Sequence, residues 1–260
     1  MVEIQEEDRT SSSNNNDTES SNPRVTLSEY LSTRHIECLL NGARALTLFF
    51  TVCYLSPIPL VVAPGSAYYK AFAAGVATSA IRLHQRIGRF ALTREFFMNL
   101  LMEDSCHYLF YSALFLTSST ITMALLPIVL YATLNFANFI VKLLVSTGYQ
   151  RLRLTTLLGK FIHSQTSNIL GIIACAEIFL VPLIISLVFV GQGSLVLPFV
   201  YYRFLTMRYA SRRNPYTRSA FSQMKHSLLQ ISHSPSCPQL VGRLITMSTN
   251  FISNLAPVTV

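Results

Sequence analysis

Residues 168–190, with the sequence NILGIIACAEIFLVPLIISLVFV, decide the fold class. A helix needs about 20 mostly apolar residues to cross ~30 Å of hydrocarbon, and this stretch is long enough. Over the whole chain, 51% of the residues are apolar and only 12% are charged, whereas an ordinary soluble domain has roughly 25% charged residues. We therefore predict an all-α, multi-pass integral membrane protein and no soluble enzyme.

Two further apolar blocks precede this one. Residues 43–63 are long enough for one span, and a shorter apolar stretch follows at 67–81. Residues 106–145 are about twice as long as a span needs to be, and the polar residues 118–120 interrupt them as the turn of a hairpin would. After residue 190, a short apolar stretch at 195–207 again follows a full-length one. The pattern predicts a membrane domain at 29–208, built from hydrophobic helices or helical hairpins.

The basic residues indicate how the chain lies in the membrane. Short loops rich in Lys and Arg stay on the cytoplasmic side, and the segments 82–94, 146–165 and everything after 203 qualify. If all of them are cytoplasmic, an even number of crossings separates them, which favours three hairpins with shallow or re-entrant shorter arms. A simpler arrangement has three full spans near 43–63, 107–130 and 168–190. The sequon at Asn16 distinguishes the two, because a sugar there requires a lumenal N-terminus.

The two ends of the chain differ from its middle. Residues 1–28 carry acids and the tract SSSNNN, and this composition predicts a disordered leader. All 12 acids of the chain lie at or before Glu177, whereas the 83 residues after it contain seven Lys or Arg. In so apolar a chain, a basic end is expected to face lipid phosphates rather than nucleic acid. We therefore predict that residues 209–260 form a basic cytoplasmic tail.

This tail has the periodicity of two amphipathic helices. Apolar residues recur at spacings of three and four from Ala220 to Ile231, and a second apolar face runs from Leu240 to Leu255. Such helices can lie on an anionic bilayer, bind in a groove of a partner, or fold back on the membrane domain of the same chain. The candidate membrane-surface contacts are Arg203, Arg208, Arg212, Arg213, Arg218, Phe221, Met224, Lys225 and Leu228.

Two groups of polar residues are candidates for chemistry. Glu177 near the middle of a span would cost about 2.5–3.5 kcal/mol if it faced lipid, so we expect an intramembrane polar contact to another helix in preference to a transport role. Glu103, Asp104, Cys106 and His107 lie within about one helical turn and could bind a metal or act as acid and base. Acids at a helix start and a histidine at a membrane boundary explain that motif without chemistry. We therefore predict no catalytic residue, no metal site and no cofactor.

Four strings in the chain together resemble one family. They are SAIRLHQR (79–86), LLMEDSCHYLFYS (100–112), ACAEIFLVP (174–182) and GQGSLVLPFVYYRFLTMRYASRRNPYTR (191–218). In this order and spacing they resemble the transmembrane protein 33 family, also called Krüppel homologue 2, whose fungal relatives are pore-membrane proteins associated with nuclear pores. The resemblance covers about residues 35–258 and leaves the acidic leader outside.

The resemblance implies residence in the endoplasmic reticulum membrane and nuclear envelope. It further implies a role in shaping the reticulum by opposing reticulon-type proteins, links to nuclear pore distribution and, in animal members, to stress-sensor signalling. Family members are usually described with three spans and a cytoplasmic tail, and residues 221–231 match a fungal tail helix thought to bind membranes. We therefore expect a non-catalytic scaffold or regulator of membrane shape. Its expected partners are the lipid bilayer, reticulon-type proteins and nuclear pore membrane proteins, and no nucleic acid. The alternatives are a stress-signalling adaptor and a small transporter or channel that uses Glu177.

Overall fold

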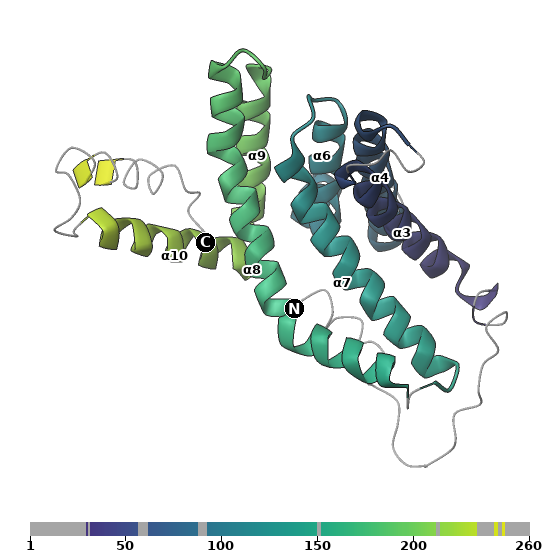
Figure 1. The fold of residues 1–260 in the computed structure, drawn as a ribbon. Helices are drawn as coiled ribbons and strands as arrows, with labels where there is room; N and C mark the ends of the chain where they lie inside the picture. Colours follow the sequence, from purple (N-terminus) through teal and green to yellow (C-terminus); the bar gives the residue numbers. More distant parts are fainter. Residues whose placement is uncertain are drawn as a thin grey trace.

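The protein is described by a computed structural model that covers residues 30, 32–56, 62–87, 93–149, 152–211, 214–232, 242–243 and 246–247. Within these residues the chain is helical and contains no strand, so the all-α prediction is confirmed. The predicted leader, residues 1–28, lies outside the described residues. The helices are α3 (His35–Leu55), α4 (Pro64–Ile87), α5 (Arg94–Met102), α6 (Asp104–Leu116), α7 (Thr122–Ser146), α8 (Arg153–Phe189), α9 (Val196–Ala210) and α10 (Pro215–Ser232) (Figure 1).

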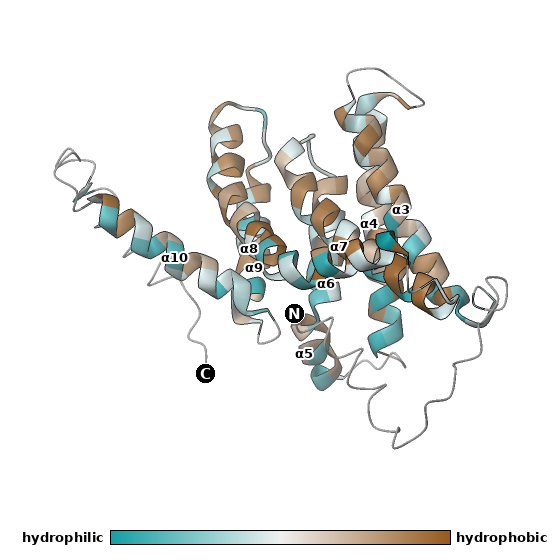
Figure 2. Ribbon diagram, turned by 60° about the horizontal axis from the view of Figure 1, so that its bottom comes forward, coloured by the Kyte–Doolittle hydropathy of each residue, from teal (hydrophilic) through white to brown (hydrophobic). Residues whose placement is uncertain are grey.

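Three of the described helices, α3, α7 and α8, are long and apolar enough to cross a membrane. Helix α8 has 37 residues, and at about 1.5 Å per residue its length of roughly 55 Å exceeds the ~30 Å hydrocarbon core. Figure 1 shows that α8 changes direction partway along, so that its first part runs across the bundle and the remainder runs along it. Figure 2 shows hydrophobic residues along the upright parts of α7 and α8 and a mixed surface on α10.

Two segments predicted as basic loops are largely helical, and this part of the prediction is wrong. Arg82 and Arg86 lie in the last turns of α4, and residues 153–165 form the first turns of α8. In both segments the charged residues alternate with Leu, Ile or Phe at helical spacing, so the helix continues after the hydrophobic span has ended. Charge alone located these segments, but it did not distinguish a loop from a polar extension of a helix.

Helices that follow each other along the chain run antiparallel, α3 and α4, α6 and α7, and α8 and α9 (Figure 1). The most extensive packing is between α3 and α4, between α4 and α6 and between α7 and α8. Helix α6 ends at Leu116 and α7 begins at Thr122, so the predicted turn at residues 118–120 is confirmed. A single span over 107–130 is therefore wrong. The α8–α9 turn begins at Gly191, whose φ of 76° is left-handed and therefore favours glycine. The Gln192 amide donates to the Leu187 carbonyl at 2.9 Å and closes the end of α8.

The start of α4, the turn between α6 and α7 and the turn between α8 and α9 lie at one end of the bundle, which we call the tip end. The Tyr69 hydroxyl donates to the Ser118 carbonyl at 3.3 Å, and the Ser119 hydroxyl donates to the Gln192 carbonyl at 3.4 Å. These contacts join the first pair to the second and the second to the third. The opposite end, where α4 and α9 end and α6 begins, is called the base end. The helical pairs thus share one direction, as three hairpins inserted from one side would.

Buried aromatic rings make up much of the core between the hairpins. Neighbouring ring centroids lie 4.8–5.9 Å apart in tilted or edge-on pairs, a geometry that aromatic rings favour. Lipid tails are as apolar as these side chains, so close packing between helices, rather than exclusion from water, holds a membrane bundle together. Each of these residues is at most 1% exposed: Tyr68, Phe72, Tyr111, Phe115, Tyr201 and Phe204.

Gly75 allows α4 to approach α6 and α7. A Cβ atom at this position would lie 3.2 Å from Ser112 Oγ and 3.4 Å from Ile128 Cγ2, whereas one at Gly171 of α8 would have no atom within 4 Å. We expect Gly75→Leu to lower the free energy of unfolding by about 1–3 kcal/mol, because the packed helices must separate. Gly171→Leu should change it much less. Titration of the purified protein with a denaturing detergent measures both, and equal losses would contradict the close approach.

Helix α10 leaves the base end and lies across the direction of α8 and α9 (Figure 1). Residues close in sequence determine where α10 starts. Pro215 is the first helical residue, and the Tyr216 amide donates to Asn214 Oδ1 at 3.0 Å. The predicted first amphipathic helix of the tail is therefore present. The predicted second helix, residues 240–255, lies almost entirely outside the described residues.

Candidate functional site

A group of charged side chains is buried where α6, α8 and α9 meet. Glu177 is 0% exposed and Arg208 is 1% exposed. Arg208 Nε donates to Glu177 Oε2 at 3.3 Å, and Arg208 Nη1 donates to Asp104 Oδ1 at 3.1 Å. A charge buried without a partner is strongly destabilising, so each of these three groups depends on the others.

Hydroxyl groups complete this arrangement. The Tyr108 hydroxyl donates to Glu177 Oε1, and Arg208 Nη2 donates to the hydroxyls of Tyr108 and Tyr131 at 3.2 and 3.3 Å. The Arg208 guanidinium carbon also lies 4.9 Å from the centroid of the Tyr108 ring, within range of a cation–π contact. At the end of α9, the Ser211 hydroxyl donates to Asp104 Oδ1 at 3.2 Å.

We call this set the Arg208 network. It ties the α8–α9 hairpin to the α6–α7 hairpin through one buried cation and two carboxylates. A further bond runs within the α8–α9 hairpin, where the Tyr201 hydroxyl donates to the backbone carbonyl of Glu177 at 2.8 Å. The members of the network are Asp104, Tyr108, Tyr131, Glu177, Arg208 and Ser211.

Glu177 meets other helices rather than lipid. Each of its carboxylate oxygens accepts a hydrogen bond, one from α6 and one from α9. Glu177 is also absent from the described residues that line the nearby cavity. A carboxylate that relays protons or ions needs access to water or to a substrate path. The geometry therefore gives Glu177 the role of a structural partner for Arg208.

Arg208 was expected at the headgroup boundary, and that prediction is wrong. Its guanidinium is paired inside the bundle and cannot reach lipid phosphates. The sequence held a signal for this position, because Arg208 follows Tyr201, Phe204 and Leu205 at helical spacing on the buried face of α9. The single acid of an apolar span also requires a partner, and Arg208 lies on the arm that pairs with that span.

The other candidate membrane contacts lie in different surroundings. Arg203 and Lys225 are exposed, on α9 and α10 respectively, and Arg218 is half-buried. Arg212 and Arg213 lie outside the described residues.

The apolar candidates on α10 are all half-buried: Phe221, Met224 and Leu228. Phe221 and Met224 pack beside Ala220 against a small cluster of α8 and α9 that includes Ile178 and Leu205. The first half of the apolar face of α10 thus folds back on its own chain. Further along the helix, Ile231 is 54% exposed.

The EDSCHY motif is split between structural contacts. Asp104 belongs to the Arg208 network, and Glu103 accepts a hydrogen bond from Arg86 at 3.3 Å. The His107 ring places Nε2 2.7 Å from the Leu101 carbonyl oxygen. Among the described residues, no group of three or more His, Cys, Asp or Glu side chains is placed to hold a metal ion. Sequence reasoning did not identify the partner of Asp104, because that partner lies 104 residues away.

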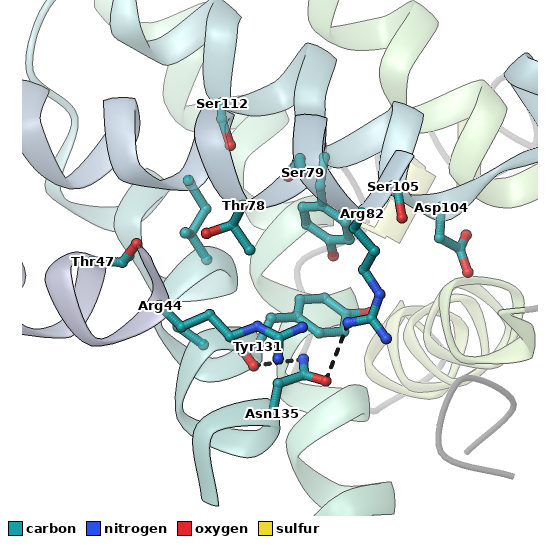
Figure 3. A pocket seen from close by; sticks show the side chains of 14 residues that line it. Arg44, Thr47, Thr78, Ser79, Arg82, Asp104, Ser105, Ser112, Tyr131 and Asn135 are labelled. Atoms are coloured by element: carbon teal, nitrogen blue, oxygen red, sulfur yellow. Dashed lines mark hydrogen bonds between the residues drawn. The ribbon is translucent and has the colours of Figure 1, made fainter. Parts of the chain in front are cut away.

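A cavity of about 80 Å³, lined by polar and apolar side chains, lies beside the Arg208 network, between α3, α4, α6 and α7 (Figure 3). Asp104, Tyr108 and Tyr131 line it and also belong to the network. The lining also includes two arginines, Arg44 of α3 and Arg82 of α4. The cavity and the network therefore share one wall.

Sequence comparison identifies the family of this chain. Residues 19–258 match the family described as Transmembrane protein 33/Nucleoporin POM33. A Transmembrane protein 33 homolog of Caenorhabditis elegans is 51% identical over 232 residues, which cover 89% of this chain and 85% of that protein. Transmembrane protein 33 of Homo sapiens is 40% identical over 229 residues, covering 88% of this chain and 93% of that protein.

A third relative, Krueppel homolog 2 of Drosophila melanogaster, is 36% identical over 239 residues, covering 92% of this chain and 85% of that protein. No solved structure matches the chain. The resemblance noted from four short strings is confirmed, since a family match over most of the chain and the relatives agree. The chain therefore belongs to the Transmembrane protein 33/Nucleoporin POM33 family of membrane proteins.

Proposed function

We propose that this protein acts in the endoplasmic reticulum membrane and nuclear envelope as a non-catalytic scaffold that regulates membrane shape and nuclear pore organisation. The observation that carries the proposal is the position of α10, which extends outward from the base end of α8 and α9, across the direction of these two helices (Figure 1). The family name supports a place at the pore membrane. Reticulon-type proteins and nuclear pore membrane proteins are the partners that we propose.

The unequal hairpins support a direct effect on membrane shape. Helix α6 has 13 residues and α9 has 15, so at about 1.5 Å per residue they are roughly 20 and 22 Å long. Neither reaches across the ~30 Å hydrocarbon core. Short arms that enter from the base end, together with a surface helix at that end, occupy more area in one leaflet than in the other. This asymmetry favours a membrane that is convex on the base side.

The second half of α10 provides the surface that we assign to the bilayer. Phe221 and Met224 already contact α8 and α9, which leaves the exposed Ile231 and the half-buried Leu228 as the apolar contacts. Lys225 is exposed beside this face. A cationic side chain near an anionic surface contributes about 1 kcal/mol of attraction. Anionic lipid should therefore stabilise α10 more than neutral lipid does.

Lys225→Gln tests this surface in the full-length protein. In nanodiscs that contain phosphatidylserine, we expect amide exchange in the second half of α10 to be slower than in phosphatidylcholine. Lys225→Gln should reduce that difference about fivefold, because one headgroup attraction is lost. Hydrogen exchange with mass spectrometry measures it. Gln223→Glu is the matched control, since it also lowers the net charge by one but lies on the opposite side of α10. Equal losses in the two variants would assign the effect to net charge and contradict a specific contact face.

The partner half of the proposal is tested by copurification in mild detergent. The intact protein and a version that lacks residues 211–260 are purified in parallel, and the copurifying proteins are identified. Tail-dependent recovery of reticulon-type or pore-membrane proteins supports the scaffold, and tail-independent recovery moves the contact to the hairpins. Recovery of neither class with either version contradicts the scaffold.

The alternative functions need features of a different kind. A transporter that uses Glu177 needs an accessible carboxylate, and the contacts of Glu177 to Tyr108 and Arg208 close that path. A stress-signalling adaptor needs a surface that is specific for a sensor protein and does not depend on lipid. In the copurification experiment, such an adaptor would recover a stress sensor in place of membrane-shaping proteins.

A further inference from the structure

The first part of α8, residues 153–165, exposes apolar side chains on the side that faces away from the bundle. Ile162 is 9% exposed, so one side of this part packs against the rest of the chain. Leu154, Leu157 and Phe161 are 54%, 64% and 43% exposed. Their spacing of three and four residues places them along one face of the helix. We call this face the outer face of α8.

Two basic side chains border the outer face. Arg153 and Lys160 are both exposed, and at 3.6 residues per turn they lie next to Leu157 and opposite Ile162. Among the described residues, neither side chain forms an ion pair or a hydrogen bond. The sequence also offers them no acid nearby, because none occurs at residues 105–176. The outer face therefore combines an apolar stripe with uncompensated positive charge.

The direction of the first part of α8 places the outer face at the membrane surface. Residues 168–189 of α8 are about 33 Å long at 1.5 Å per residue, which is enough to cross the ~30 Å hydrocarbon core. The first part precedes this span, and Figure 1 shows that it runs across the bundle. A helix that turns across the bundle where its span ends lies along the membrane interface. There an apolar face meets acyl chains, and a basic border meets headgroups.

We propose that residues 153–165 form an interfacial helix that binds the anionic bilayer surface through the outer face of α8. The three apolar side chains enter the boundary between acyl chains and headgroups, and the two cations contact anionic headgroups. The positive charge and the direction of the helix favour lipid over a protein partner as the occupant of this face. The contact is separate from the second half of α10 and requires none of the proposed protein partners.

Tryptophan fluorescence tests the position of the outer face, because the chain contains no tryptophan of its own. Leu157→Trp introduces one on the outer face of the full-length protein, which is reconstituted into phosphatidylcholine vesicles. Lipids that carry bromine near the headgroup end of their acyl chains quench an indole in contact with them. We expect strong quenching of Leu157→Trp and weaker quenching of Thr156→Trp, which is exposed on the basic side of the helix. Leu154→Trp repeats the measurement on the outer face.

A second measurement tests the preference for anionic lipid. Brominated phosphatidylserine or brominated phosphatidylcholine is added in a small amount to phosphatidylcholine vesicles that hold the Leu157→Trp protein. Stronger quenching by the serine lipid measures its enrichment beside the helix. Lys160→Gln in this background should reduce the enrichment about fivefold, because one headgroup attraction is lost. Lys70→Gln makes the same change at an exposed residue of α4 near the tip end, and it should leave the enrichment unchanged.

Each outcome supports or overturns the proposal. Quenching on the outer face, with an enrichment of phosphatidylserine that depends on Lys160, supports it. Quenching of Leu157→Trp by water-soluble acrylamide in place of brominated lipid places the outer face in water and overturns it. Blue-shifted emission that neither quencher reduces shows that a protein surface, such as a second copy of the chain, covers the face, and this also overturns it.

Equal quenching by the two brominated lipids, or equal effects of Lys160→Gln and Lys70→Gln, overturns the proposal as well. None of these variants changes α10 or the tail that the copurification experiment removes. The scaffold proposal therefore stands or falls separately.

Discussion

Arg208→Gln is expected to lower the free energy of unfolding by about 3–5 kcal/mol. The substitution removes the cation shared by Glu177 and Asp104, and it leaves the fully buried Glu177 carboxylate without its cation beside the partly exposed Asp104. The hairpin α8–α9 should then separate from α6–α7, since the network joins the two. Titration of the purified protein with a denaturing detergent, followed by circular dichroism, measures the loss.

Arg203→Gln is the matched control for this experiment. It makes the same chemical change on the same helix, but Arg203 is exposed, so a loss within about 0.5 kcal/mol is expected. The reciprocal variant Glu177→Gln should also destabilise, because the buried Arg208 keeps only the partly exposed Asp104 as a carboxylate partner. The double variant Glu177→Met with Arg208→Met should recover much of the loss, since replacing a whole buried pair by apolar groups is often neutral. Similar losses for Arg203→Gln and Arg208→Gln would refute the network.

Cysteine labelling is expected to place the segments that precede and follow the second and third hairpins on the same side of the membrane. In a background in which the native cysteines are replaced by alanine, Glu95→Cys, Arg153→Cys and Lys225→Cys should all react with an impermeant maleimide added outside sealed microsomes. The effect is all or none. It follows because α5, the first part of α8 and α10 all lie toward the base end, and the basic residues there favour the cytoplasmic side.

Tip-end positions supply the contrast. Ser119→Cys and Gln192→Cys should not react from outside, because their turns contact each other at the opposite end. Labelling after permeabilisation shows which positions are reactive at all. Three full spans predict a different result, in which Arg153→Cys alone is protected while Glu95→Cys and Lys225→Cys react. That pattern would contradict the hairpins.

The elements that depend on local sequence were predictable. Length and hydropathy located the apolar helices, although α3 begins and ends eight residues before the predicted 43–63. The polar residues 118–120 identified a turn, because a turn depends on a few neighbouring residues. The periodicity of residues 220–231 likewise predicted α10. The last turns of α4 and the first turns of α8 were predicted as loops. They are polar extensions of a helix beyond its hydrophobic span, and charge alone does not distinguish such an extension from a loop.

The contacts of the candidate site depend on tertiary structure. That Glu177 needs a polar partner follows from its cost in lipid, but the identity of that partner does not. Arg208 was assigned to the surface because Arg203 and Arg212 nearby in the sequence carry the same charge. Within α9, the buried Arg208 and the exposed Arg203 differ only in the face of the helix on which they lie. The cavity was not predicted at all, since Arg44, Arg82 and Asn135 come from three helices and form no motif.

The continuous path of α8 has a mechanical consequence. One part of this helix lies across the base end and the other runs along the bundle (Figure 1), and the helix continues from Arg153 to Phe189 through this change of direction. A force that reorients the part near the membrane surface therefore tilts the upright part as well. The hydrogen bonds between the turns at the tip end then carry that tilt to the other two hairpins. A displacement at the base end would thus reach the tip end as a tilt of the bundle.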